Sequence, residues 1–319
     1  MSLFLVKRLL SLLSILFIAS LIIFFTIDSL PGDAAQIQLG VNAQEDTLAA
    51  KRAALGLDRP ALVRYWAWVS GFVFGDMGTS LSYNVPVSTM VKDRMGVSVP
   101  LALIALILAT VIGLFVGVAA ASRHKKPTDT SVMAFSQIGV AIPNFWFGFL
   151  LIMVFALYFR VLPAGSFPGW QKEPGLLGIW LGLKSLILPS IALAFPQAAI
   201  LARVTRSNLL ETSGELFVRT ARAKGLTRQQ AIWRHALRNA MIPVVTIMGL
   251  QFSFLIAGAI VIERVFNLAG IGSLIFQAIA GRDLIVVQSL VLILVAAVVI
   301  VTFIVDLVYL WIDPRLRTA

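Results

Sequence analysis

The segment between residues 203 and 239 has the residue types and spacing from which function can be argued most directly. Thr212-Ser-Gly-Glu215 fits the capping box, in which a threonine caps a helix start and a glutamate three residues later reaches back to it. Thr227-Arg-Gln-Gln230 fits the same pattern, and Gly225 between them suits the left-handed position that follows a helix end. The spacing therefore predicts two short, self-capped helices joined by a glycine turn, the second of which runs into Asn239.

The residues of this segment are suited to docking on a partner protein and not to catalysis. Arg219, Arg222 and Lys224 could pair with acidic side chains of a partner, and Ala221 and Ala223 would allow close approach. The chain has no cysteine, only two histidines and no Gly-x-Ser-x-Gly nucleophile turn. Thiolate metal sites and the common hydrolase arrangements therefore gain no support. We expect this chain to be no enzyme and to hold no resident metal or cofactor.

The elements that must position this segment are membrane helices. The chain of 319 residues is 59% hydrophobic and 13% charged, whereas soluble domains are about 45–50% apolar and about 25% charged. A larger core could not absorb this difference, because a soluble protein of this size must still cover its surface with polar groups. Lipid is therefore the solvent for most of the chain.

Six stretches are long and apolar enough to cross a bilayer, for which a helix needs about 20 residues. They predict an all-α integral membrane protein with six transmembrane helices, at residues 9–30, 99–121, 132–159, 186–201, 241–262 and 284–312. The fourth stretch has the least defined ends, because Pro189 and Pro196 interrupt it. The first is expected to be a retained anchor, since its apolar run exceeds the about 7–15 residues of a cleavable signal.

The distribution of lysine and arginine predicts the orientation. With the N-terminus inside, the cytoplasmic segments hold 15 of the 26 basic residues but only 5 of the 15 acidic ones. The net charge of +11 is thus concentrated on one face, and no nucleic-acid partner is needed to explain it. Both termini are expected in the cytoplasm, and residues 203–239 are expected to form a cytoplasmic loop.

Three parts follow one another along the chain. They are an N-terminal anchor at residues 1–30, an external insert at 31–98 and a transmembrane core at 99–313 that contains the cytoplasmic loop. Within the insert, one short helix is expected to end before Gly56 and another to begin at Pro60. The second has an apolar face, which is expected to rest on the helix bundle or at the lipid interface.

Three interpretations of residues 203–239 are open from the residues alone. The segment could be a solvated loop whose charge only fixes the topology, a DNA-binding helix–turn–helix, or a docking element for a cytoplasmic partner. Both ends of the segment enter membrane helices within a few residues, so it has little freedom to seat in a DNA groove. We favour docking.

Phe217-Val-Arg-Thr-Ala-Arg-Ala-Lys-Gly-Leu226, followed by His235-Ala-Leu-Arg-Asn-Ala240, resembles the coupling loop of type I ABC importer permeases. The likeness is to the oligopeptide and dipeptide branch, which also contains nickel and glutathione permeases. The general loop begins Glu-Ala-Ala and has a later Leu-Pro; Arg219-Thr-Ala221 and Leu237-Arg238 depart from it in the way the peptide branch does. Similar motifs extend over nearly the whole chain: Leu30-Pro-Gly-Asp33, Leu55-Gly-Leu-Asp58, Gly75-Asp76 with Gly78, Ser80-Leu81, Pro143-Asn-Phe-Trp146, Leu162-Pro-Ala164, Glu263 with Val265-Phe266, and Arg282-Asp283.

The resemblance implies a type I ABC importer permease fold in the bacterial inner membrane, and the long insert after the first span is similar to that of the B-type subunit. It implies as partners a homologous C-type permease, two cytoplasmic ATP-binding subunits and an external solute-binding protein. It implies ATPase-coupling roles for Arg219, Thr220, Ala221, Arg222, Ala223, Lys224, Gly225, Leu226, His235, Leu237 and Arg238. ATP and Mg²⁺ would be bound by the partners, in keeping with the absence of a G-x-x-x-x-G-K-[ST] phosphate loop from the sequence.

The resemblance leaves the solute open among peptides, nickel, glutathione and opine-like compounds, with a peptide or peptide-like solute expected. An ion-coupled secondary transporter and a non-transporting membrane scaffold are the alternatives. Secondary transporters are usually built from internal repeats and carry ionisable groups inside the membrane. Asp306 is the one carboxylate well inside an apolar run here, which argues against that class.

Overall fold

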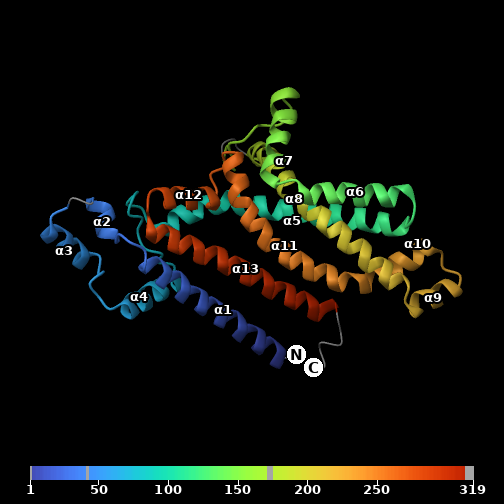
Figure 1. The fold of residues 1–319 in the computed structure, drawn as a ribbon, viewed down its shortest axis with the longest axis horizontal. Helices are drawn as coiled ribbons and strands as arrows, with labels where there is room; N and C mark the ends of the chain where they lie inside the picture. Colours follow the sequence, from blue (N-terminus) through green and yellow to red (C-terminus); the bar gives the residue numbers. More distant parts are fainter. Residues whose placement is uncertain (1, 41–42, 171–174, 313–319) are drawn as a thin grey trace. The chain divides into compact units, whose positions relative to one another are not determined.

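The computed structural model describes residues 2–40, 43–170 and 175–312, which are largely helical and contain no β-strand (Figure 1). The helices are α1 (Ser2–Asp28), α2 (Ala34–Leu39), α3 (Glu45–Ala54), α4 (Ala61–Val73), α5 (Val87–Ser122), α6 (Pro127–Ala141), α7 (Asn144–Leu151), the π-helix η1 (Ile152–Tyr158), α8 (Leu176–Ser213), α9 (Leu216–Ala223), α10 (Arg228–Ala231), the π-helix η2 (Ile232–Ala236), α11 (Leu237–Val265), α12 (Ile271–Ala280) and α13 (Leu284–Ile312).

The all-α membrane fold expected from the sequence is confirmed. Within the described residues, five helices are long and apolar enough to cross a membrane, and the bent pair formed by α6 with α7 and η1 makes a sixth candidate. α13 begins and ends at the expected residues. Contacts divide the chain into two compact units, the first comprising residues 99–268 and the end of α13 from residue 301, and the second comprising residues 2–98 and 269–300.

The third expected span, at residues 132–159, is not one straight helix. The axis turns by 102° between α6 and the α7–η1 pair. Ile142 follows the end of α6 with φ −83° and ψ 123°, and Pro143 is the cap residue directly before α7. The cause is local, because the ring of a proline disfavours the helical conformation at the residue before it.

The fourth expected span, at residues 186–201, is far too short. α8 is one helix of 38 residues that contains both Pro189 and Pro196. It is the central helix of the first unit and packs against α6, α7 and α11. Burial of this apolar surface against three neighbours offsets the backbone hydrogen bonds that the two prolines remove.

Two glycines allow α5 to lie directly on α8 in the first unit. A Cβ atom on Gly117 would be 2.6 Å from the backbone oxygen of Ala202, and one on Gly113 would be 2.7 Å from Cβ of Leu201. Cβ atoms are essentially never found this close to atoms of another helix. The spacing of the pair, four residues on one helix face, is the small-residue pattern that permits close helix packing in membranes.

In the second unit, α4 packs against α1 through Tyr65, which is 1% exposed. The Tyr65 hydroxyl is 2.9 Å from the Ser20 hydroxyl of α1, and its ring meets that of Phe24 edge to face. Leu62 and Trp66 on the same helix are exposed, as suits side chains at a lipid interface. The expected end of α3 before Gly56 is confirmed. The expected start of α4 is confirmed to within one residue, because Pro60 is its cap and the helix begins at Ala61.

A buried carboxylate holds the corner between α12 and α13 of this unit, a corner the sequence did not suggest. Asp283 is 1% exposed. Its Oδ2 accepts hydrogen bonds from the Ser80 hydroxyl at 2.6 Å and from the Ser82 backbone N–H at 3.1 Å. The contact joins the segment at residues 80–82 to the start of α13.

Candidate coupling site

The first helix of the coupling segment begins later than the capping box predicts. α8 continues to Ser213, so Thr212 lies in its last turn, and Gly214 ends it. α9 then begins at Leu216 with Glu215 before it, and no side chain caps its start. The expectation of a Thr212 cap is therefore wrong. The reason is that Leu209, close to the end of α8, is fully buried, and packing extends α8 through the box.

The other end of α9 is formed as expected. Gly225 has φ +96°, the left-handed conformation that side chains other than glycine adopt only with strain. The Gly225 N–H donates to the carbonyl of Arg222 at 3.0 Å, and the Leu226 N–H donates to that of Ala221 at 3.4 Å. This pair of bonds is the Schellman motif, which satisfies carbonyls that a helix end leaves open.

The second capping box is confirmed atom by atom. The Gln230 N–H donates to the Thr227 hydroxyl at 3.3 Å, and the Thr227 N–H donates to the Gln230 side-chain oxygen at 3.0 Å. The helix that follows is not short, however. α10, η2 and α11 form one continuous helical run from residue 228 to residue 265. Neither a glycine nor a proline stands between Gln230 and Asn239 to end it, so the expected second short helix is the beginning of a membrane span.

α9 is anchored on a buried apolar cluster that joins three long helices of the first unit. Val218 is 2% exposed and belongs to this cluster. Ala221, one helical turn away, is also buried, at 8% exposed. The other buried members come from the end of α5, the end of α8 and the run that starts α11: Val118, Ala121, Leu209, Ala231, Ile232, Ala236 and Ala240. In Figure 1, α9 lies in gold beside the end of α8 and the start of α11. The cluster therefore connects α9 to the ends of these helices.

The sequence-predicted coupling residues divide into an exposed set and a supporting set. Leu226 and Leu237 are half-buried and pack on the cluster. Ala221 is buried against its own protein, so its small size does not serve close approach of a partner as expected. The exposed members, which lie on α9, its glycine turn and the start of the next helix, are Arg219, Thr220, Arg222, Ala223, Lys224, Gly225, His235 and Arg238.

The exposed face combines cations with large apolar side chains. Arg219, Arg222 and Lys224 have no ion-pair partner among the residues that the structure describes. Leu216 and Phe217 beside them are 76% and 41% exposed. Sequence reasoning did not single out these two, although two large apolar residues at the edge of a basic loop were a visible signal. Such a combination is typical of a surface that another protein covers.

A second feature missed from the sequence fixes the end of α8 that precedes α9. Asp129, in the first turn of α6, is 3% exposed. The Arg206 guanidinium of α8 donates to both of its carboxylate oxygens, at 2.5 and 2.7 Å. The Lys125 N–H and the His124 ring lie 3.2 Å from the same carboxylate. Such two-point pairs fix geometry as well as adding stability, but 77 residues separate the partners in sequence.

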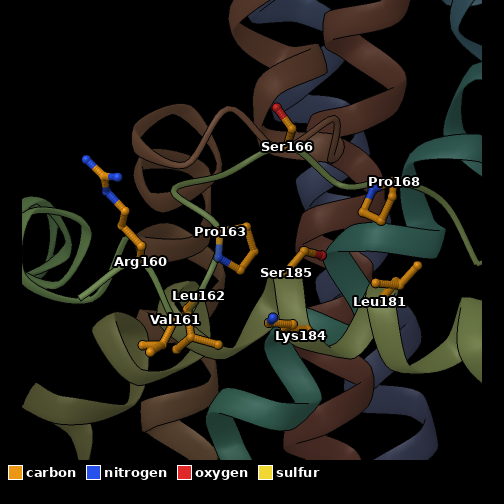
Figure 2. Close-up of a pocket in the computed structure, with 9 residues that line it drawn as sticks. All are labelled: Arg160, Val161, Leu162, Pro163, Ser166, Pro168, Leu181, Lys184 and Ser185. Atoms are coloured by element: carbon orange, nitrogen blue, oxygen red, sulfur yellow. The ribbon is translucent and has the colours of Figure 1, made fainter. Parts of the chain in front are cut away.

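A cavity of about 520 Å³ lies near the other end of α8, against residues 160–168. Arg160 and Lys184 both line it, and Figure 2 shows the side chain of Arg160 extending away from the other labelled residues. The described residues that line the cavity include these two cations and no carboxylate. Its walls are otherwise serines, prolines and aliphatic side chains.

Comparison with known proteins agrees with this geometry. Residues 110–318 match the family described as the binding-protein-dependent transport system inner membrane component, and residues 1–102 match the corresponding N-terminal family. A protein of Brucella abortus named as a peptide transport system permease is 37% identical over 317 residues, which cover 99% of each chain. The glutathione transport system permease GsiC of Escherichia coli is 36% identical over 314 residues, or 98% of each chain.

The fold is also shared with a solved transporter. The inward-facing MetNI methionine ABC transporter has a chain that matches with a TM-score of 0.57 and 18% identity, covering 70% of this chain and 96% of that one. The family match, the relatives and the fold favour an importer permease over an ion-coupled secondary transporter. The chain belongs to the family of binding-protein-dependent transport system inner membrane components and is a multi-pass permease subunit of an ABC importer.

Proposed function

We propose that the exposed face of α9 and the start of the α10–α11 run form the docking surface for a cytoplasmic ATP-binding subunit. The observation that carries the proposal is the position of α9: Val218 packs it against the ends of α5 and α8 and the start of the α10–α11 run, and its cations and apolar groups are exposed. A helix held in this way transmits displacement, because a packed cluster shifts as a body and does not deform continuously.

The assembly proposed around this chain contains a second, homologous C-type permease, two cytoplasmic ATP-binding subunits and an external solute-binding protein. The chain would lie in the bacterial inner membrane with both termini in the cytoplasm. ATP and Mg²⁺ would be held by the ATP-binding subunits, and this chain would hold no cofactor and catalyse no reaction. The names of the Brucella and E. coli relatives, which refer to peptide and glutathione transport, support a peptide or peptide-like solute.

The coupling role can be tested at Gly225. A valine there would be strained by its positive φ alone, because nothing lies within 4 Å of the site that a Cβ would occupy. Gly75 on the external side is a matched control, with φ +88° and equally open space. We expect Gly225→Val to uncouple ATP hydrolysis from solute uptake in reconstituted vesicles while membrane insertion is unchanged. Equal uptake by the Gly225→Val and Gly75→Val complexes would count against a coupling role.

A further inference from the structure

The second unit contains a cavity of about 530 Å³ that is separate from the coupling site described above. It lies among the end of α1, the helices α2, α3 and α4, and the first turns of α13. Three arginines and two aspartates line it: Arg52, Arg59, Arg64, Asp28 and Asp33. Its charged lining therefore carries one more positive charge than negative.

The two aspartates use only part of the hydrogen-bonding capacity of the arginines. Asp28 accepts from both terminal nitrogens of Arg64, at 2.5 and 2.9 Å. Asp33 accepts from Nε of Arg52 at 2.6 Å. The terminal nitrogens of Arg52 and the whole guanidinium of Arg59 are left without a protein acceptor among the described residues. Guanidinium groups in this condition favour phosphate or carboxylate.

Two further donors in the same cavity lining also have no partner. Nε1 of Trp68 on α4 and Nε2 of Gln288 on α13 are buried and make no hydrogen bond within the described residues. A buried donor without an acceptor is energetically costly, so native proteins seldom leave one. Two of them in one cavity, together with the arginines, indicate a missing acceptor with several oxygens.

The rest of the lining is apolar and indicates the other half of the ligand. Phe24, Ile27, Val63 and Ile285 form part of the wall. Under the proposed topology, the end of α1 and the start of α13 lie at the external surface of the membrane. The cavity therefore presents cationic donors and an apolar wall at the depth where a lipid headgroup meets its chains.

We propose that this cavity binds the phosphodiester headgroup of an anionic phospholipid from the external leaflet, with the first part of its acyl chains against the apolar wall. The proposal rests on the topology above but not on coupling to ATP. A bound lipid would join α1 and α4 to the start of α13 through the acceptor that Arg52, Arg59 and the two unpartnered donors lack.

The test measures lipid binding to the assembled, delipidated complex by native mass spectrometry, with phosphatidylglycerol and phosphatidylcholine as probes. Arg59→Gln removes the unpaired charge, and Trp68→Phe removes one donor while keeping an aromatic ring. Lys92→Gln, at an exposed cation of the same unit outside the cavity, is the matched control. We expect phosphatidylglycerol to bind more tightly than phosphatidylcholine, and Arg59→Gln to weaken it about tenfold, with no change in Lys92→Gln.

Equal binding of the two lipids, or equal phosphatidylglycerol affinity in the wild-type and Arg59→Gln complexes, would overturn the proposal. Full displacement of the lipid by glycerol 3-phosphate would also overturn it, because the site would then recognise a soluble phosphate. If Trp68→Phe does not assemble, Arg59→Gln decides alone. Binding is read without ATP or solute, so failure here leaves the coupling proposal intact.

Discussion

Replacing Val218 by alanine should release α9 from the protein without changing the surface that it presents. Val218 is 2% exposed, and the substitution removes its two methyl groups. At about 0.8 kcal/mol for each buried carbon, the loss is about 1.6 kcal/mol, and any cavity left behind adds to it. α9 has only eight residues and two buried side chains. This loss is therefore a large share of what orders the helix.

The effect is measured by hydrogen exchange of the α9 amides in the assembled transporter. A loss of about 1.6 kcal/mol corresponds to roughly 15-fold faster exchange if the helix opens locally. Coupling should weaken in parallel, so that ATP is hydrolysed with less uptake. Protection of the α5 and α8 amides away from the cluster should not change.

Phe217→Ala provides the control, because the neighbouring Phe217 is 41% exposed and outside the buried cluster. This variant should exchange at the wild-type rate in the isolated permease but bind the ATP-binding subunits less tightly. If Val218→Ala left both exchange and coupling unchanged, the cluster would not be what orders α9, and α9 would not act on α5, α8 and α11 through it.

Two further predictions concern the helices that hold the site. Gly117→Val should lower the melting temperature of the detergent-solubilised complex markedly, because its Cβ would meet the backbone oxygen of Ala202 at 2.6 Å; an unchanged melting temperature would contradict the close contact of α5 and α8. Burial alone would raise the pKa of Asp33, but the Gln36 N–H and the Arg52 guanidinium together hold that pKa below its ordinary value of 3.8. Asp33 thus adds stability that is complete above that value and is lost as the pH falls below it. Asp33→Asn should therefore melt lower than the wild type at pH 7 by a difference that narrows toward pH 3, and a constant difference would refute this.

The features that local sequence determines were predictable. Gly225 forms the turn expected of it, Thr227 and Gln230 cap each other, and α13 has the expected ends, because each depends on residues within one or two turns. The break before Pro143 was also visible in principle, since proline restricts the residue before it. A prediction of one straight span over residues 132–159 misses this break.

The remaining features depend on partners far away in the chain. α8 remains one helix through Pro189 and Pro196 because it packs against α6, α7 and α11. No local sequence pattern records that packing. The Asp129–Arg206 pair joins residues 77 apart, and Ser80 meets Asp283 across 203 residues. The predicted cap at Thr212 was wrong for the same reason. Leu209 is buried by distant residues, and α8 therefore continues past Thr212 to Ser213.

Site-directed photo-cross-linking tests the docking surface most directly. Because this chain has no cysteine, a single introduced cysteine is the only thiol in it that a maleimide can label. Ala223→Cys and Ala221→Cys differ by two positions on α9, the first exposed and the second 8% exposed. With a maleimide-linked benzophenone on each, we predict that Ala223→Cys cross-links to an ATP-binding subunit in the assembled transporter and that Ala221→Cys does not. Absence of any cross-link from Ala223→Cys to such a subunit would contradict the assignment of α9 as the coupling helix.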